Sequence, residues 1–137
     1  MRCPYHDDIE AIEKPVIAMI NGICAGGGVE MSVACDFRIA SSGAVFGQPQ
    51  VRFGAPAAYE LMRAVMGAGA AREMCLTGRR YDAAEALAIG LVNRVVEPAE
   101  LVGVARGLAH EVATLPDGVA ETAKQGFRAQ QPRLFES

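Results

Sequence analysis

The sequence predicts a single α/β domain, and three observations support this prediction. Strand-like and helix-like segments alternate up to about Pro98, and helical patterns follow, with no internal repeat or linker. The length of 137 residues fits one compact domain. Three consecutive glycines separate an apolar strand-like run from a helix-like segment. We therefore expect one domain over residues 1–137, with an α/β core at about 12–98 and carboxy-terminal helices at about 99–137.

The amino-terminal elements follow from periodicity and breakers. A short surface helix is expected over 8–14, ended by Pro15, and His6 is expected to be an exposed residue without a partner pattern. The run PVIAMI has the length and β-branched content of a buried strand. The expected elements after it are a helix up to Ala34, strands at 37–40 and 44–46, a turn at 41–43 and an irregular loop at 47–50.

Helical spacing dominates beyond Gly54. Asp82 is a suitable cap for a helix that Gly90 terminates, and LVNRVV reads as a strand ending before Pro98. The methionines of the early helices read as core filling. The expected elements are helices at 57–65, 70–76, 83–88, 100–115 and 119–130, and a strand at 91–96.

Composition excludes several protein classes. A hydrophobic fraction of 51%, a charged fraction of 21% and a net charge of −3 describe a soluble globular protein, neither disordered nor nucleic-acid-binding. No apolar run is long enough for a membrane span, and the amino terminus lacks the apolar core of a signal peptide. Cys3, Cys24, Cys35 and Cys75 show no metal-ligand spacing, so free thiols in a reducing cytoplasm and no metal are expected.

The glycine-rich junction that follows PVIAMI, up to Glu30, contains the candidate catalytic residues. Glycine adopts positive φ and lets a ligand approach closely, and the first turn of a helix offers unpaired N–H groups at the positive end of its dipole. Glu30 falls in that first turn. Strand, glycines, helix start and carboxylate together predict the floor of an active site. The alternative is that Glu30 only stabilises the helix through charge–dipole attraction.

Other motifs are weak. The glycines do not match G-x-G-x-x-G and no G-K-[ST] follows, while Ser32 lies outside any G-x-S-x-G. His110 is expected on a helix surface. Arg79 and Arg80 fit a phosphate contact or a solvated turn about equally well.

Three blocks, in order, resemble one known family. KPVIAMINGICAGGGVEMSVACDFRIAS, FGQP and LTGRRYDAAEALAIGLVNRVV are similar to the crotonase family, the enoyl-CoA hydratase/isomerases, from about Ile12 to about Arg128. The resemblance implies a spiral of ββα units, acyl-CoA thioester substrates of fatty acid metabolism, and trimers or hexamers. It implies no cofactor beyond the coenzyme A of the substrate, no nucleic acid and no membrane partner.

The resemblance also implies roles for particular residues. The backbone N–H of Gly27 would bind the thioester oxygen as part of an oxyanion hole, and Glu30 would transfer the proton. The remaining residues expected at the substrate are Ala25, Gly26, Gly28, Gln50, Pro56 and Tyr59.

Three departures from the family pattern bear on the reaction. Gln50 stands where hydratases carry a second acid, and an amide cannot transfer the proton. The stretch after Gly54 reads APAAYELMRAVMG rather than a glycine-rich turn, which puts Pro56, Tyr59 and Glu60 beside the acyl pocket, although Glu60 reads as a solvated acid. The chain is about half the length of a typical member, whose amino-terminal part supplies the other oxyanion N–H. Loss of one such donor costs about 100-fold or more in rate, so independent activity is expected to be weak.

Two functions remain open on the sequence. The first is a lyase or isomerase of the enoyl-CoA hydratase/isomerase type, including a double-bond shift that needs only Glu30. The second is a catalytically silent protein of the same fold that binds a CoA thioester or assists assembly.

Overall fold

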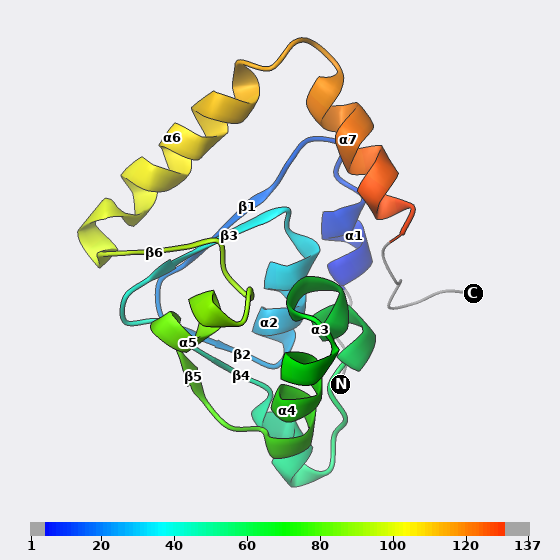
Figure 1. Cartoon of the computed structure of the whole chain (residues 1–137), viewed down its shortest axis with the longest axis vertical. Coiled ribbons are helices and arrows are strands. Elements are labelled where there is room, and N and C mark those ends of the chain that lie inside the picture. Colours follow the sequence, from blue (N-terminus) through cyan, green and yellow to red (C-terminus); the bar gives the residue numbers. More distant parts are fainter. Residues whose placement is uncertain (1–4, 131–137) are drawn as a thin grey trace.

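The protein folds into two small sheets with helices packed around them, as a computed structural model that describes residues 5–130 shows (Figure 1). The helices are α1 His6–Glu10, α2 Gly27–Ala34, α3 Tyr59–Met66, α4 Ala68–Thr77, α5 Ala83–Ala88, α6 Leu101–Ala113 and α7 Val119–Arg128, with 3₁₀ turns η1 Pro49–Phe53 and η2 Pro98–Glu100. The strands are β1 Ile17–Ile20, β2 Ile23–Ala25, β3 Phe37–Ser41, β4 Val45–Gly47, β5 Tyr81–Asp82 and β6 Arg94–Val96. The mixture confirms the α/β class.

The first four strands alternate between the two sheets. One sheet has the order β1-β3-β6 with all pairs parallel, and the other has the order β2-β4-β5 with β2 and β4 parallel and β4 and β5 antiparallel. Asn21 and Gly22 carry the chain from β1 in one sheet to β2 in the other. β1 and β3 are parallel neighbours, so the chain between them must cross over, and α2 brings it from β2 back to β3.

The main core lies between α2, α3, α4 and the second sheet. Met62 and Met74 are fully buried there, which confirms the interpretation of these methionines as core filling. Burying a side chain of this size contributes roughly 1.5–3 kcal/mol. A second apolar cluster joins α6 to the first sheet through Ile39, Leu101 and Leu108. Ile20 and Ala40 of the first sheet also belong to the main core, so this core joins the two sheets, and the second cluster adds the packing of α6. The glycine junction, residues 25–30, borders the main core through Val29.

Several expected elements are confirmed with small shifts. The helix after the glycines ends at Ala34, and the helix expected at 83–88 has those bounds. Asp82 accepts a hydrogen bond from the Glu85 N–H at 2.8 Å, and the Glu85 carboxylate accepts one from the Asp82 N–H at 3.2 Å, forming a capping box. Gly90 follows that helix with φ of 82°.

Other expectations are wrong. The short strands β2 and β5 were not expected, and the strand expected at 91–96 begins only at Arg94, because Leu91 and Val92 are buried in the main core as an irregular segment. The loop expected at 47–50 gives way to η1 from Pro49. The first helix covers 6–10 rather than 8–14. His6 is only 1% exposed rather than on the surface, because α1 packs against α2.

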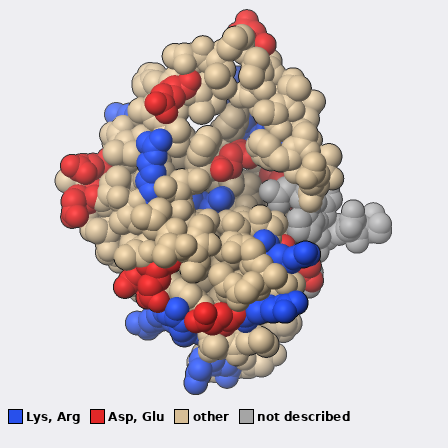
Figure 2. Space-filling view, in the orientation of Figure 1, with Lys and Arg blue, Asp and Glu red and all other residues tan. Residues whose placement is uncertain are grey.

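The polar surface is mixed in sign. Figure 2 shows acidic and basic side chains close together, most densely at the end where α4 lies. Arg79 donates to Glu73 and to Glu85, at 2.8 Å each, and its guanidinium lies 3.8 Å above the Tyr81 ring. The two acids raise the pKa of Arg79 above its usual value. Arg79 therefore belongs to a surface ion-pair cluster, which favours the structural reading of the Arg79–Arg80 turn.

No helix within residues 5–130 is both long and apolar enough to cross a membrane.

Candidate active site at the glycine junction

The pairing of β2 with β4 positions the glycine junction. Ala25 lies opposite Gly47 at the end of this pair, and the Gly26 N–H donates to the Gly47 carbonyl at 3.0 Å. Gly26 has φ of 56°, in the left-handed region that favours glycine. The chain can therefore leave the strand and enter α2 within one residue.

The first exposed amide of the junction belongs to Gly27. The Gly26 N–H is already bonded to Gly47, whereas Gly27 and Gly28 begin α2 and are exposed. Amides in the first turn of a helix have no intrahelical acceptor and lie at the positive end of the dipole. The arrangement therefore offers a donor to a negatively charged oxygen that arrives from outside.

Glu30 lies one turn into α2 and is buried, with 1% of its surface exposed. Its N–H donates to the Gly26 carbonyl at 3.1 Å, which fixes the first helical turn. A carboxylate that served only the helix dipole would gain nothing from burial, because desolvation disfavours its charged form. The burial of Glu30 favours a chemical role over a simple dipole interaction.

Two hydrogen-bonded amides, the half-buried Gln50 next to Gly26 and the buried Gln48, lie beside the glycines. The Gln50 Nε2 donates to Gln48 Oε1 at 2.6 Å, and the Gln48 Nε2 donates to Met62 Sδ at 3.4 Å. Gln50 Oε1 is buried without a hydrogen-bond partner among residues 5–130, and it lies 3.4 Å from the place that a Cβ on Gly26 would take. Gln50 is thus brought to the junction as expected. Gln48, fully buried, was not singled out, although it belongs to the FGQP block.

The other expected site residues divide into two groups. Ala25, Gly26, Gly27, Gly28 and Glu30 lie within residues 25–30 at the junction, and Gln50 of η1 lies next to Gly26. Pro56 is exposed, and Tyr59 packs against the main core and lines a separate cleft with Arg63. The structure therefore does not bring Pro56 or Tyr59 into contact with the glycines.

Neither Cys24 nor Ser32, the nucleophile side chains nearest the glycines, is set up to attack a substrate. Burial raises the pKa of the Cys24 thiol, although its hydrogen bond to Ser32 lowers it. The Ser32 hydroxyl donates to the Val29 carbonyl at 2.8 Å, inside α2. Both side chains are therefore part of the core beneath the glycines.

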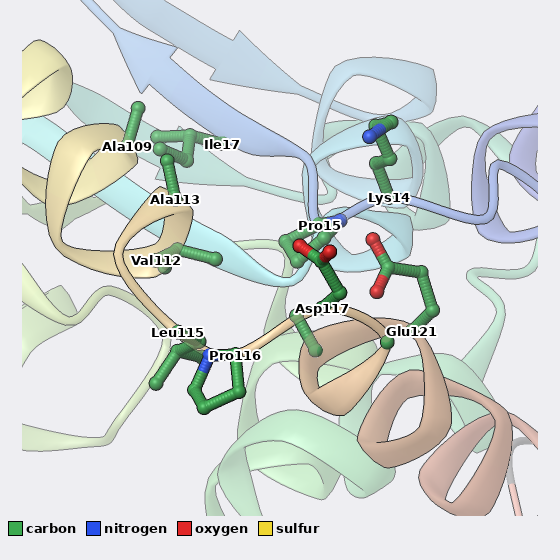
Figure 3. Close-up of a pocket in the computed structure, with 12 residues that line it drawn as sticks. Lys14, Pro15, Ile17, Ala109, Val112, Ala113, Leu115, Pro116, Asp117 and Glu121 are labelled. Carbon is green, nitrogen blue, oxygen red and sulfur yellow. The ribbon is translucent and has the colours of Figure 1, made fainter.

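The groove in Figure 3 lies elsewhere. It has a volume of about 320 Å³ between β1, α6 and the start of α7, with Ile17, Val112 and Ala113 on one side and Asp117 and Glu121 on the other. Figure 2 shows it as a hollow between the upper helices. None of the residues expected at the substrate lines it.

Comparison with known proteins decides the family. The family model described as enoyl-CoA hydratase/isomerase matches residues 4–134. The chain belongs to the enoyl-CoA hydratase/isomerase family. A short-chain-enoyl-CoA hydratase of Clostridium acetobutylicum is 42% identical over 122 residues, which cover 87% of this chain and 47% of the relative. A crotonyl-CoA hydratase of Syntrophomonas wolfei is 44% identical over 107 residues, which cover 76% of this chain and 41% of the relative.

The fold of this enoyl-CoA hydratase/isomerase family member agrees with solved structures. An enoyl-CoA hydratase/carnithine racemase from Magnetospirillum magneticum superimposes with a TM-score of 0.87 at 34% identity, covering 91% of this chain and 48% of that one. The crotonase-like fold expected from the three sequence blocks is therefore confirmed. The chain spans about half the length of the curated relatives it matches.

Proposed function

We propose that the protein acts on acyl-CoA thioesters, with the Gly27 N–H stabilising the thioester oxygen as an enolate forms and Glu30 transferring the proton. The observation that carries this proposal is that α2 begins at the exposed Gly27 and buries Glu30, which is 1% exposed, in the same first turn, in a member of the enoyl-CoA hydratase/isomerase family. A backbone donor at the positive end of a helix stabilises developing negative charge strongly. The names of the relatives, which are hydratases of enoyl-CoA and crotonyl-CoA, support the substrate class.

The geometry supports proton transfer by one carboxylate. Gln50 faces the glycines as an amide, so within the described junction Glu30 is the residue that can accept and return a proton. A shift of a double bond through an enolate requires only one such group, which removes a proton from one carbon and returns it to another. We therefore propose an isomerase-type reaction, with hydration as the alternative that the names of the relatives favour.

Replacing Glu30 tests the proposal. Glu30→Gln is expected to lower α-proton exchange of an acyl-CoA in D₂O by about 10²–10⁴-fold, because the amide cannot act as the base while its size is retained. NMR of the thioester during incubation with the full chain measures the exchange. The matched control is Glu60→Gln, because Glu60 is an exposed acid at the start of α3. Equal exchange in the two variants would contradict the role of Glu30, and thioester binding without any exchange would support a silent binding protein.

Converting Gln50 to an acid tests the choice between isomerisation and hydration. Gln50→Glu is expected to raise enoyl-CoA hydration, because it restores a second carboxylate beside the glycines. The new carboxylate oxygen would face Gln48 Oε1 at the position where Nε2 now donates over 2.6 Å, so Gln48 must turn its amide to donate instead. Gln50→Glu/Gln48→Leu should therefore gain less hydration activity than Gln50→Glu alone.

The loss of enoyl absorbance measures hydration, and Gln125→Glu, at an exposed position of α7, is the control. A gain no larger than that of the control would show that the pocket is shaped for other chemistry.

We further propose a cytoplasmic homo-oligomer, a trimer or hexamer. Large apolar side chains on the described surface support association, since Ile23, Phe53 and Leu76 are 84%, 87% and 81% exposed.

A further inference from the structure

A group of three side chains on α1 lies apart from the glycine junction. His6 Nδ1 is 3.1 Å from Asp7 Oδ1 and 3.6 Å from Glu10 Oε2. One ligand atom from each of the three residues lies within 4.8 Å of the others. His6 and Glu10 are four residues apart, so α1 presents them on one face. One imidazole nitrogen therefore faces two carboxylates.

These separations match the edges of a metal coordination shell. Metal–nitrogen bonds of about 2.0–2.1 Å and metal–oxygen bonds of about 2.0–2.2 Å place neighbouring ligand atoms about 3.0–3.5 Å apart. The 3.1 Å distance from His6 Nδ1 to Asp7 Oδ1 falls at this spacing, and the 3.6 Å distance to Glu10 Oε2 lies just above it. Side-chain rotations that draw the three atoms together would let all of them contact one ion.

Burial and charge favour a divalent cation at this position. The side chains of His6 and Glu10 are 2% and 8% exposed, and that of Asp7 is 19% exposed. With a neutral imidazole the three groups carry a charge of −2. Arg38 and Arg128 line a cleft together with Glu10, so a divalent ion would compete with these cations for the Glu10 carboxylate. The same cleft, of about 290 Å³, is lined by residues of α2, α3 and α7, so the Glu10 side of the group can be reached from it.

We propose that His6, Asp7 and Glu10 form a binding site for one divalent transition-metal ion. One imidazole and two carboxylates are a borderline donor set that suits Zn²⁺, Co²⁺ and Mn²⁺. Mn²⁺ should bind more weakly than Co²⁺. The site is independent of the proposed acyl-CoA chemistry, and it replaces the expectation from the sequence that His6 has no partner pattern.

Metal titration of the full chain tests the site. Co²⁺ is added to the purified protein and followed by its visible absorption, and Zn²⁺ is then added to displace it. One ion per chain is expected. His6→Gln and Glu10→Gln are each expected to weaken binding at least about 100-fold, because loss of even an outer-shell partner costs about 10–100-fold. The chain offers two matched controls, Asp8→Asn on the exposed side of the same helix and His110→Gln on α6, and both should bind like the original protein.

Nitrogen NMR of the unmutated protein keeps the test valid where a variant at the buried His6 fails to fold. The sequence has two histidines, and Zn²⁺ should shift the ring resonances of His6 while leaving those of His110 in place. Absence of stoichiometric binding, unchanged affinity in His6→Gln, or a thiolate charge-transfer band with Co²⁺ would each overturn the proposal.

Discussion

Lys124→Met is expected to release α7 from the rest of the protein. Lys124 is the buried residue of this helix, at 1% exposure, whereas Val119 and Phe127 are 46% and 45% exposed. Its Nζ lies 2.9 Å from Asp36 Oδ2 and donates to the Lys14 carbonyl at 2.7 Å. Removing one partner of a buried ion pair costs about 3–5 kcal/mol. When α7 undocks, Asp36 is hydrated again and its charge is no longer buried. The stability lost in Lys124→Met therefore cannot exceed the free energy with which α7 docks.

Native-state hydrogen exchange measures this release. Amides of α7 should lose protection by about 10²–10³-fold in Lys124→Met, as the free-energy difference requires. Lys14→Met is the matched control, because the Lys14 side chain is exposed and only its backbone carbonyl takes part. Lys124→Met/Asp36→Asn should recover part of the protection, since the amide oxygen still accepts from the Val16 N–H that Asp36 now binds at 2.8 Å. Equal protection of α7 in the two methionine variants would show that the ion pair does not dock the helix.

Arg38→Met is expected to destabilise the whole domain rather than one helix. Arg38 lies in β3 and is buried, and its Nε donates to the Leu91 carbonyl at 2.7 Å. Its Nη1 donates to the Cys35 and Ser32 carbonyls at 2.7 and 3.2 Å, which caps the end of α2 with positive charge. Burial lowers the pKa of Arg38 from its usual value. Methionine keeps the volume but removes the donors to the Leu91 and Cys35 carbonyls, while the Ser32 carbonyl still accepts from the Cys35 N–H at 3.1 Å. The expected cost is about 3–5 kcal/mol.

Urea unfolding followed by far-UV circular dichroism measures this loss, because the chain has no tryptophan. Arg94→Met is the control, since Arg94 is exposed on the neighbouring strand β6. Arg38→Lys should fall between the two, because an ammonium retains the charge but cannot reach both sets of carbonyls with a planar fork. A midpoint for Arg38→Met equal to that of Arg94→Met would show that backbone relaxation satisfies the carbonyls.

The junction was predictable because local rules agree there. The apolar run favours a strand, the consecutive glycines allow a sharp entry into the helix, and the carboxylate favours a helix start. The structure places β1, Gly26 and Glu30 accordingly. The Asp82 cap was predictable for the same reason, since its hydrogen bonds are made within four residues.

The features that the sequence did not predict depend on packing between distant segments, which the local pattern does not encode. β2 is three residues long and its central residue alone is buried, so it has too few alternations to be recognised. Leu91 and Val92 are apolar because the core needs them rather than because they pair in a sheet. Lys124 on a polar helix gives no sign of burial, because its partner Asp36 lies far away in the sequence. Gln48 was missed because its role depends on Gln50 and Met62.

The step from β1 to β2 has a consequence for how this protein can vary. Asn21 and Gly22 connect strands of two different sheets, and the second of these strands holds the Gly26 amide on Gly47. An extra residue between Ile20 and Ile23 that is not absorbed as a bulge in this connection shifts the register of β2 against β4 by one position, which turns Cys24 outward and separates the Gly26 amide from Gly47. Side-chain replacements around the glycines leave this spacing intact. Insertions and deletions between β1 and β2 should therefore disturb the site more than most substitutions there. The number of residues between these strands sets the position of the Gly26 amide.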